Sequence, residues 1–215
     1  MRISRRAAGL AAGVALTVGA TGLAAPAAQA APTQAATKLG TKSLAAVLTA
    51  DKSGFDTNRN DYDILTAAVL AVLKAKPKSP VGALTNGKVA LTAFAPSDQA
   101  FRLLVKDITR KTLVRERDVF AAVAKLGIPT VEAVLLYHVV PGKTIDAKAA
   151  AKANNVVLHT AVRLPVKVRV VKGKIYLQDL DKNDVNPQVI VPDVNKGNRQ
   201  IAHGINYVLR PVNLP

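Results

Sequence analysis

A strand, its end and the start of a helix follow one another in TAFAPSDQAF, residues 92–101. The apolar run ahead of Pro96 predicts a strand that ends there, because proline has no amide to donate to a β ladder. Ser97 is placed to cap the helix that follows, since its hydroxyl can accept from a free amide of the first turn. Phe94 and Phe101 are the expected core anchors of these two elements.

Helical patterns lie on both sides of this junction. We expect helices at 44–48, 64–73, 97–108, 116–126 and 131–138, and a short one that begins after Asp146. Ser43 is placed to cap the first of them. The segment 64–73 is apolar on every face apart from Thr66, so we expect this helix at the centre of the core.

From Val156 onwards the hydrophobic period changes to two. Val166 and Val168 alternate with Lys167 and Arg169, which predicts a hairpin with one buried face and one basic face. We expect strands at 88–95, 156–158, 166–170, 174–177, 189–191 and 205–209. Helices early in the chain and strands late predict an α+β domain rather than repeated βαβ units.

The first 30 residues have the pattern of a secretory signal peptide. Arg2, Arg5 and Arg6 form a positive start, a small-residue apolar run follows, and Ala28-Gln29-Ala30 is an A-x-A cleavage site. An uncleaved membrane anchor is the alternative, which the cleavage site disfavours. We expect a bacterial chain that is cut after Ala30 and secreted by the general or the twin-arginine route.

The expected organisation is a signal peptide at 1–30, a flexible leader at 31–42 and a single domain at 43–215. The leader is polar and contains Ala, Thr and Pro, a composition typical of a linker. The C-terminus lacks a hydrophobic tail, so we expect no membrane insertion of the mature protein. The expected location is extracellular, with association to the cell wall as an option.

The composition excludes several classes of functional site. The 215 residues contain no Cys and no Trp, which excludes a disulfide framework, a thiolate zinc site and a cysteine nucleophile. Aromatic residues make up only 4%, so an aromatic platform for specific nucleic-acid binding is not expected. Lys and Arg number 30 against 14 acids, and loss of the three N-terminal arginines leaves a net charge of +13. This charge favours an anionic partner without naming one.

Five cationic residues lie along the predicted hairpin or just before it. They are Arg163, Lys167, Arg169, Lys172 and Lys174. Because side chains two residues apart point the same way along a strand, part of this set should form one basic row. We expect these residues to contact sulfated or phosphorylated polymers of a wall or matrix, in a salt-dependent way. The alternative is a solvated strand whose cations discourage aggregation.

Enzyme signatures are absent from the sequence: there is no G-x-S-x-G, no H-E-x-x-H and no glycine-rich phosphate loop. Glu116 and Glu132 are expected on helix surfaces. Ser97, Asp98 and His138 form the one conceivable nucleophile set, which would make the protein a hydrolase, but an N-cap role explains Ser97 better. We therefore expect no catalytic residue and no cofactor.

Two segments imitate calcium-binding loops. Asp56-x-Asn58-x-Asn60 and Asp179-x-Asp181-x-Asn183 both begin in the manner of an EF-hand loop. Each lacks the glycine at the sixth position and the bidentate glutamate at the twelfth. Asx turns account for both segments, so we expect no metal site of this type.

Three motifs in order resemble the signatures of fasciclin-like domains. The first is 92–101, the second is LLYHVVPG at 135–142, and the third is VPDV at 191–194 with IAHGINYVL at 201–209. The resemblance covers about Leu39 to Pro211. It implies a single α+β domain in which helices pack on an antiparallel β wedge or sandwich. It also implies a noncatalytic extracellular adhesion module that binds a cell-surface or matrix protein or glycan.

The resemblance further implies partner-binding positions. In animal members, the region of the Tyr-His motif and a Pro-Asp-aliphatic stretch are implicated in integrin recognition. The matching residues here are Tyr137 and His138, and then Pro192, Asp193 and Val194. Turn formation is the alternative role of Pro192 and Asp193. Asn206 stands where the family usually has Asp, and 57–63 and 180–187 are additions to a minimal domain.

Overall fold

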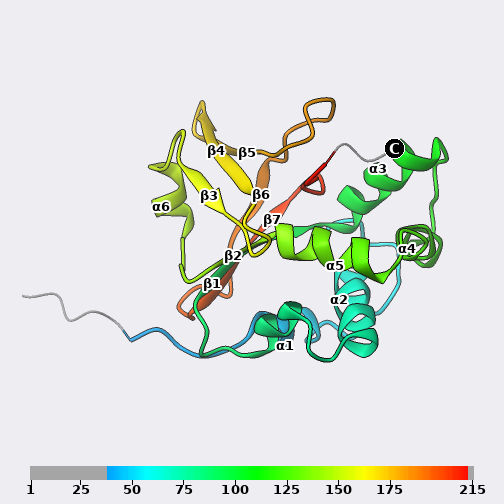
Figure 1. Cartoon of the computed structure of the whole chain (residues 1–215), viewed down its shortest axis with the longest axis horizontal. Helices are drawn as coiled ribbons and strands as arrows, with labels where there is room; N and C mark the ends of the chain where they lie inside the picture. The colour runs from blue at the N-terminus through cyan, green and yellow to red at the C-terminus, as the bar shows by residue number, and fades with distance from the viewer. Residues whose placement is uncertain (1–37, 213–215) are drawn as a thin grey trace, which may run out of the picture. The chain divides into compact units, whose positions relative to one another are not determined.

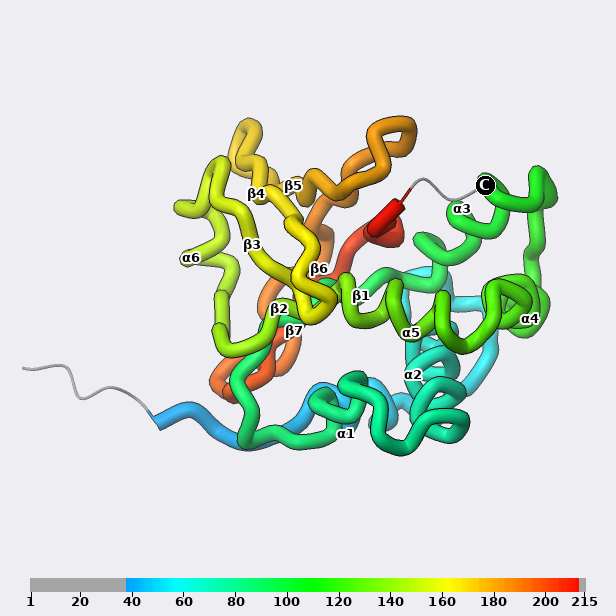
Figure 2. The backbone as a smooth tube through the Cα atoms, in the orientation of Figure 1, coloured from blue at the N-terminus to red at the C-terminus, as the bar shows by residue number. Residues whose placement is uncertain are grey.

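Residues 38–212 are the part of the chain that the computed structural model describes, and Figures 1 and 2 show how their elements are arranged. The elements are α1 (Leu44–Leu48), α2 (Asp63–Ala75), the 3₁₀ helix η1 (Pro80–Thr85), β1 (Leu91–Pro96), α3 (Asp98–Thr109), α4 (Glu116–Ala124), α5 (Ile128–Tyr137), β2 (Val139–Pro141), α6 (Ala147–Ala151), β3 (Val157–His159), β4 (Pro165–Val171), β5 (Lys174–Gln178), β6 (Val189–Val194) and β7 (Gln200–Ile205). The expected signal peptide and most of the expected leader lie outside these residues.

Three helices begin at the capping residues that the sequence predicts. The hydroxyl of Ser43 accepts from the amide of Ala46 at 3.2 Å, which starts α1. Ser97 and Asp146 start α3 and α6 in the same way. Each side-chain oxygen satisfies an amide that has no partner within its own helix, which fixes the first turn.

A four-stranded sheet has the order β2-β1-β7-β6. Its central pair is parallel, from Leu91 opposite Gln200 to Pro96 opposite Ile205, and the two outer pairs are antiparallel. The strand of the 92–101 stretch therefore pairs with a strand more than 100 residues away. β7 starts five residues before the strand expected at 205–209 and shares only Ile205 with it, so that prediction was wrong. Val208 and Leu209 are buried beyond the end of the strand.

The second sheet has the order β3-β4-β5 and is antiparallel throughout. Val166 and Val168 of β4 and Leu177 of β5 point inward and are buried. The hairpin with one buried face is thus confirmed. The sheets are linked by a bridge between Tyr176 and Gln188.

Two clusters form the core, one on each face of the four-stranded sheet. Ala93 and Ala95 of β1 pack with the helices, and Phe94 between them packs with the three-stranded sheet. This alternation is the period-two geometry of a strand. In Figure 1 the four-stranded sheet accordingly lies between helices α2–α5 and strands β3–β5. The predicted α+β class and the packing of helices on a β sandwich are confirmed.

Helix α2 departs from the prediction of complete burial. Ile64 and Val72 are fully buried, whereas Leu70 is 52% exposed. The helix packs on α4, α5 and η1, which leaves one side to solvent. Within residues 38–212, no single helix has the length and apolar character to cross a bilayer; α4 and α5 reach that composition only together, across a 104° bend.

The described domain begins its contacts before residue 43. The amide of Gly40 donates to the carbonyl of Gly197, and the amide of Arg199 donates back to the carbonyl of Gly40. The amide of Lys42 donates to the side chain of Asn198 at 2.9 Å. The last three residues of the expected leader are therefore held on the β6–β7 turn.

Candidate interaction surface

The outer face of the β3–β4–β5 sheet is basic. Lys167 and Arg169 of β4 alternate with the buried valines, and Lys174 of β5 lies on the same face by register. The residues of this face, which we call the cationic face, are Val157, His159, Pro165, Lys167, Arg169, Val171, Lys174, Tyr176 and Gln178. It contains no acidic residue. Among the described residues, no carboxylate lies within 4.0 Å of its three cations.

The other two cations of the predicted set lie in turns. Arg163 is in the turn between β3 and β4, and Lys172 is in the turn between β4 and β5. Both have a left-handed backbone, with φ of 63° and 49°. Since the two turns are at opposite ends of β4, the five predicted residues form a row of three with one cation beyond each end.

Tyr137 and His138 lie inside the domain. The hydroxyl of Tyr137 donates to the carbonyl of Pro165 at 2.8 Å. One ring nitrogen of His138, Nδ1, is 2.7 Å from the carbonyl of Val134, and Nε2 accepts from the amide of Leu209 at 2.9 Å. Burial lowers the pKa of His138 to about 4, so the ring is neutral at physiological pH. Neither side chain offers surface to a partner, and both join α5 to other elements.

The Pro192–Val194 segment forms the irregular end of edge strand β6. Asp193 has a left-handed backbone, with φ of 61°, and its amide donates to Nδ1 of His203. Its carboxylate accepts from the amide of Ala147 at 2.7 Å and pairs with Lys196 at 2.6 Å. Partial burial would raise the pKa of Asp193, but the hydrogen bonds from Lys196 and Ala147 and the charge of Lys196 together lower it. Within this segment Pro192 is exposed and Val194 is half-buried against the core.

Asn206, at the position where the resemblance implies Asp, forms a hydrogen bond through its side chain. Its side-chain oxygen accepts from the amide of Gln188 at 2.7 Å, and its own amide donates to the carbonyl of Gln188. Since an amide oxygen accepts as a carboxylate does, this contact needs no negative charge.

In the conceivable nucleophile set, Ser97 and His138 are both engaged in hydrogen bonds to the main chain. The Ser97 hydroxyl is buried and caps α3. Both ring nitrogens of His138 are bound to the main chain, so neither is available to take a proton from a serine. His203 is also buried, with one nitrogen on the amide of Asp193 and the other near the carbonyl of Ile145.

The two Asp-rich loops are built from Asx turns, as predicted. The amide of Asn58 donates to Asp56 at 2.6 Å, and the amide of Asp181 donates to Asp179 at 3.1 Å. The loop at 179–184 also surrounds an internal cation. Arg210, only 3% exposed, lies 3.4 Å from Asp181 and 2.9 Å from Asp184, and it also pairs with Asp107.

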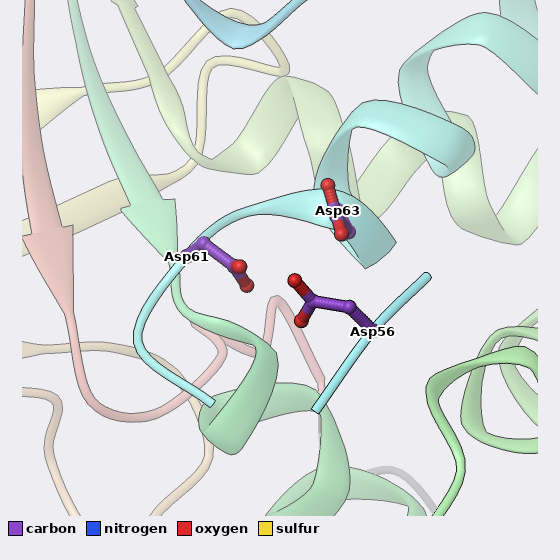
Figure 3. Close-up of side chains that lie close together, drawn as sticks. All are labelled: Asp56, Asp61 and Asp63. Atoms are coloured by element: carbon purple, nitrogen blue, oxygen red, sulfur yellow. The ribbon is translucent and has the colours of Figure 1, made fainter. Parts of the chain in front are cut away.

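The loop at 56–63 has a different environment. The carboxylates of Asp56, Asp61 and Asp63 each place an oxygen within 4.8 Å of the others, and Figure 3 shows them pointing toward a common space. Asp61 makes a second such trio with Asp98 and Glu116. The sequence does not predict this group, because the 56–63 loop, α3 and α4 come together only in the folded chain.

Burial changes the acidity of this group. It raises the pKa of Asp63 to about 6, and neighbouring carboxylates add to the effect. It raises the pKa of Asp98 to about 8, with a further contribution from the adjacent carboxylate of Asp61. Near neutral pH Asp98 is therefore largely protonated, which removes part of the negative charge of this group.

Glu116 is buried, so its predicted place on a helix surface was wrong. Its carboxylate pairs with Arg102 at 2.9 Å and accepts from the amide of Asp56 at 2.7 Å. Arg102 also donates to the carbonyl of Val114. This buried pair joins α3 to α4, and Arg102 is the one cation of residues 38–212 that forms a salt bridge with a carboxylate of the acidic group.

Comparisons with known proteins agree with this architecture. The family model described as the Fasciclin domain matches residues 65–211. The chain therefore belongs to the fasciclin domain family, whose members are typically adhesion-related modules of the cell surface or exterior. A comparison with curated proteins finds no match.

A solved structure is also similar. It is the FAS1 domain pair of the insect cell adhesion molecule fasciclin I, with a TM-score of 0.49 and 19% sequence identity. The match covers 67% of this chain and 46% of that one, so this chain spans about half the length of the domain pair.

Proposed function

We propose that this protein is a secreted, noncatalytic adhesion module that binds anionic polymers of a cell wall or extracellular matrix through its cationic face. Export would use residues 1–30 as a signal peptide, with 31–42 as the leader of the mature chain. The observation that supports the binding mode most is the row Lys167, Arg169 and Lys174, which has no carboxylate of residues 38–212 within 4.0 Å.

The chemistry of this face suits a charged glycan or a polyol phosphate. Three cations at two-residue spacing along adjacent strands can contact successive anionic groups of an extended polymer. Tyr176 stands opposite Arg169, and Val157 and Val171 are exposed beside them, which adds apolar contact area for sugar rings. Such binding weakens as salt screens the charges.

A protein contact through β6 is the second candidate. This strand is an edge of its sheet, and its Ile190 and Val191 are about 40% exposed next to Pro192. A partner that covers these residues would make apolar contacts, which are insensitive to moderate salt. Asp193 would then position the segment through Ala147 and Lys196, and would not coordinate a partner's metal.

The test is retention of the secreted chain on immobilised heparin and on teichoic acid across a NaCl gradient. The variant K167Q/R169Q/K174Q should elute at clearly lower salt than the wild type. The control K106Q/K111Q/K125Q removes the same charge from exposed lysines of the helical side and should elute close to the wild type. Equal losses by both variants would contradict a defined binding face.

The noncatalytic assignment is supported by the main-chain bonds of Ser97 and His138. Assays of the purified chain with ester and glycoside substrates should therefore show no turnover. Turnover that the Ser97→Ala substitution abolishes would overturn this part of the proposal and favour a hydrolase.

A further inference from the structure

Two acidic loops of this chain differ in what balances their charge. Around 179–184, the buried guanidinium of Arg210 reaches Asp107, Asp181 and Asp184. Around 56–63, no lysine, arginine or histidine of the described residues lies within 4.0 Å of Asp56, Asp61 or Asp63. The first loop has an internal cation and the second lacks one.

Buried carboxylate oxygens in the second group also lack hydrogen bonds. Asp63 is only 9% exposed, and its Oδ2 has no partner among the described residues. Asp98 is fully buried, and its Oδ2 likewise has none. Both carboxylate oxygens of Asp61, which lies between them, are in the same state. A buried carboxylate without a partner is costly, and it is stabilised either by taking up a proton or by binding a cation.

The spacing fits a single ion. A Ca²⁺ ion binds oxygens at roughly 2.3–2.6 Å, so two of its ligands can be at most about 5 Å apart. The oxygens of Asp56, Asp61 and Asp63 lie within 4.8 Å of one another. In Figure 3 the three carboxylates converge from the loop and from the start of α2.

We propose that Asp56, Asp61 and Asp63 bind a Ca²⁺ ion. Hard oxygen donors and the absence of nitrogen or sulfur ligands favour this class of cation. The ion would fasten the exposed loop 51–60 to the start of α2. Asp56 is exposed, so water would complete the coordination. The family model begins at residue 65, beyond all three ligands.

Calorimetric titration of the secreted chain with CaCl₂, after chelator treatment and in a NaCl background, tests this site. The wild type should release heat with a stoichiometry of one and gain thermal stability. Asp56→Asn and Asp63→Asn should each weaken affinity at least about tenfold. Asp184→Asn, from the loop that Arg210 neutralises, should leave it unchanged.

Terbium luminescence gives a second readout. Tyr62 lies between two of the ligands in sequence, and the chain has no tryptophan, so Tb³⁺ at the site should be sensitised by this ring. Tyr62→Phe should abolish the emission while Ca²⁺ affinity persists.

An absence of heat and of thermal stabilisation in the wild type would overturn the proposal. So would equal weakening by Asp184→Asn and Asp56→Asn. Neither result would alter the salt-gradient test of the cationic face, which lies on different strands.

Discussion

His138 illustrates how a family signature residue can be structural. Its neutral ring donates from one nitrogen and accepts at the other, which ties α5 to the segment after β7. The Tyr-His motif could be located in the sequence, but its burial could not, because only the packing of β4 and of residues 208–209 covers it. Tyr137 and His138, which the motif implied for partner contact, therefore stabilise the fold.

The buried histidine predicts a pH dependence of stability. The pKa of His138 is about 4 in the folded state and near 6.5 when unfolded, so between these values only the unfolded chain binds the proton. Stability from this group is complete above pH 6.5 and is lost as pH falls toward 4. Between pH 7 and pH 4 the wild type should lose roughly 3 kcal/mol more than His138→Gln. Urea unfolding of both proteins at several pH values measures this, and parallel pH curves would contradict it.

Arg210 stabilises the 179–184 loop because its buried guanidinium pairs with two aspartates of the loop. Arg210→Ala would leave Asp181 buried without its cation, and we expect a loss of about 3–5 kcal/mol. Arg110→Ala removes an exposed partner of Asp107 and should change stability by less than about 0.5 kcal/mol. Urea unfolding of the wild type and both variants measures these losses of stability. Similar small losses in both variants would show that the guanidinium of Arg210 is dispensable for stability.

At the scale of elements, the strand-to-helix junction at 92–101 was predictable because its signals are local. Pro96 ends β1 and Ser97 starts α3 through contacts within a few residues. The last strand was misplaced because Val208 and Leu209 are buried without belonging to a strand. Burial of Glu116 depends on Arg102 of another helix, which the pattern of α4 does not contain.

Gly87, which lies between η1 and β1, closely approaches the segment before α1. A Cβ added there would overlap the carbonyl oxygen of Thr41, so the segment before α1 would have to move. Gly87→Ala should therefore destabilise the domain by about 1–3 kcal/mol. Gly82→Ala is the matched control, since the nearest atom to its Cβ is 3.8 Å away in Leu73. Thermal unfolding compares them, and an equal response would argue against the contact.

At the scale of the whole molecule, the class of fold could be predicted from helices early and strands late. The parallel β1–β7 pair could not, because nothing local distinguishes parallel from antiparallel pairing across a hundred residues. The cationic face was predictable from the alternation around Lys167 and Arg169, whereas the meeting of Asp61 with Asp98 and Glu116 depended on tertiary packing.

Processing of the whole chain is testable directly. If residues 1–30 are a signal peptide, the secreted protein should begin at Ala31. Intact mass and N-terminal sequencing of protein recovered from the medium of a bacterial host measure this. Recovery of the uncut chain with the membrane fraction would instead support an anchor.

The most direct test of the proposed adhesion function is cosedimentation of the chain from Ala31 onwards with purified bacterial cell-wall material at physiological salt. The wild type should sediment with the wall and be released as NaCl is raised, and K106Q/K111Q/K125Q should behave like it. K167Q/R169Q/K174Q should remain largely in the supernatant. Equal sedimentation of all three proteins, unaffected by salt, would contradict binding through the cationic face.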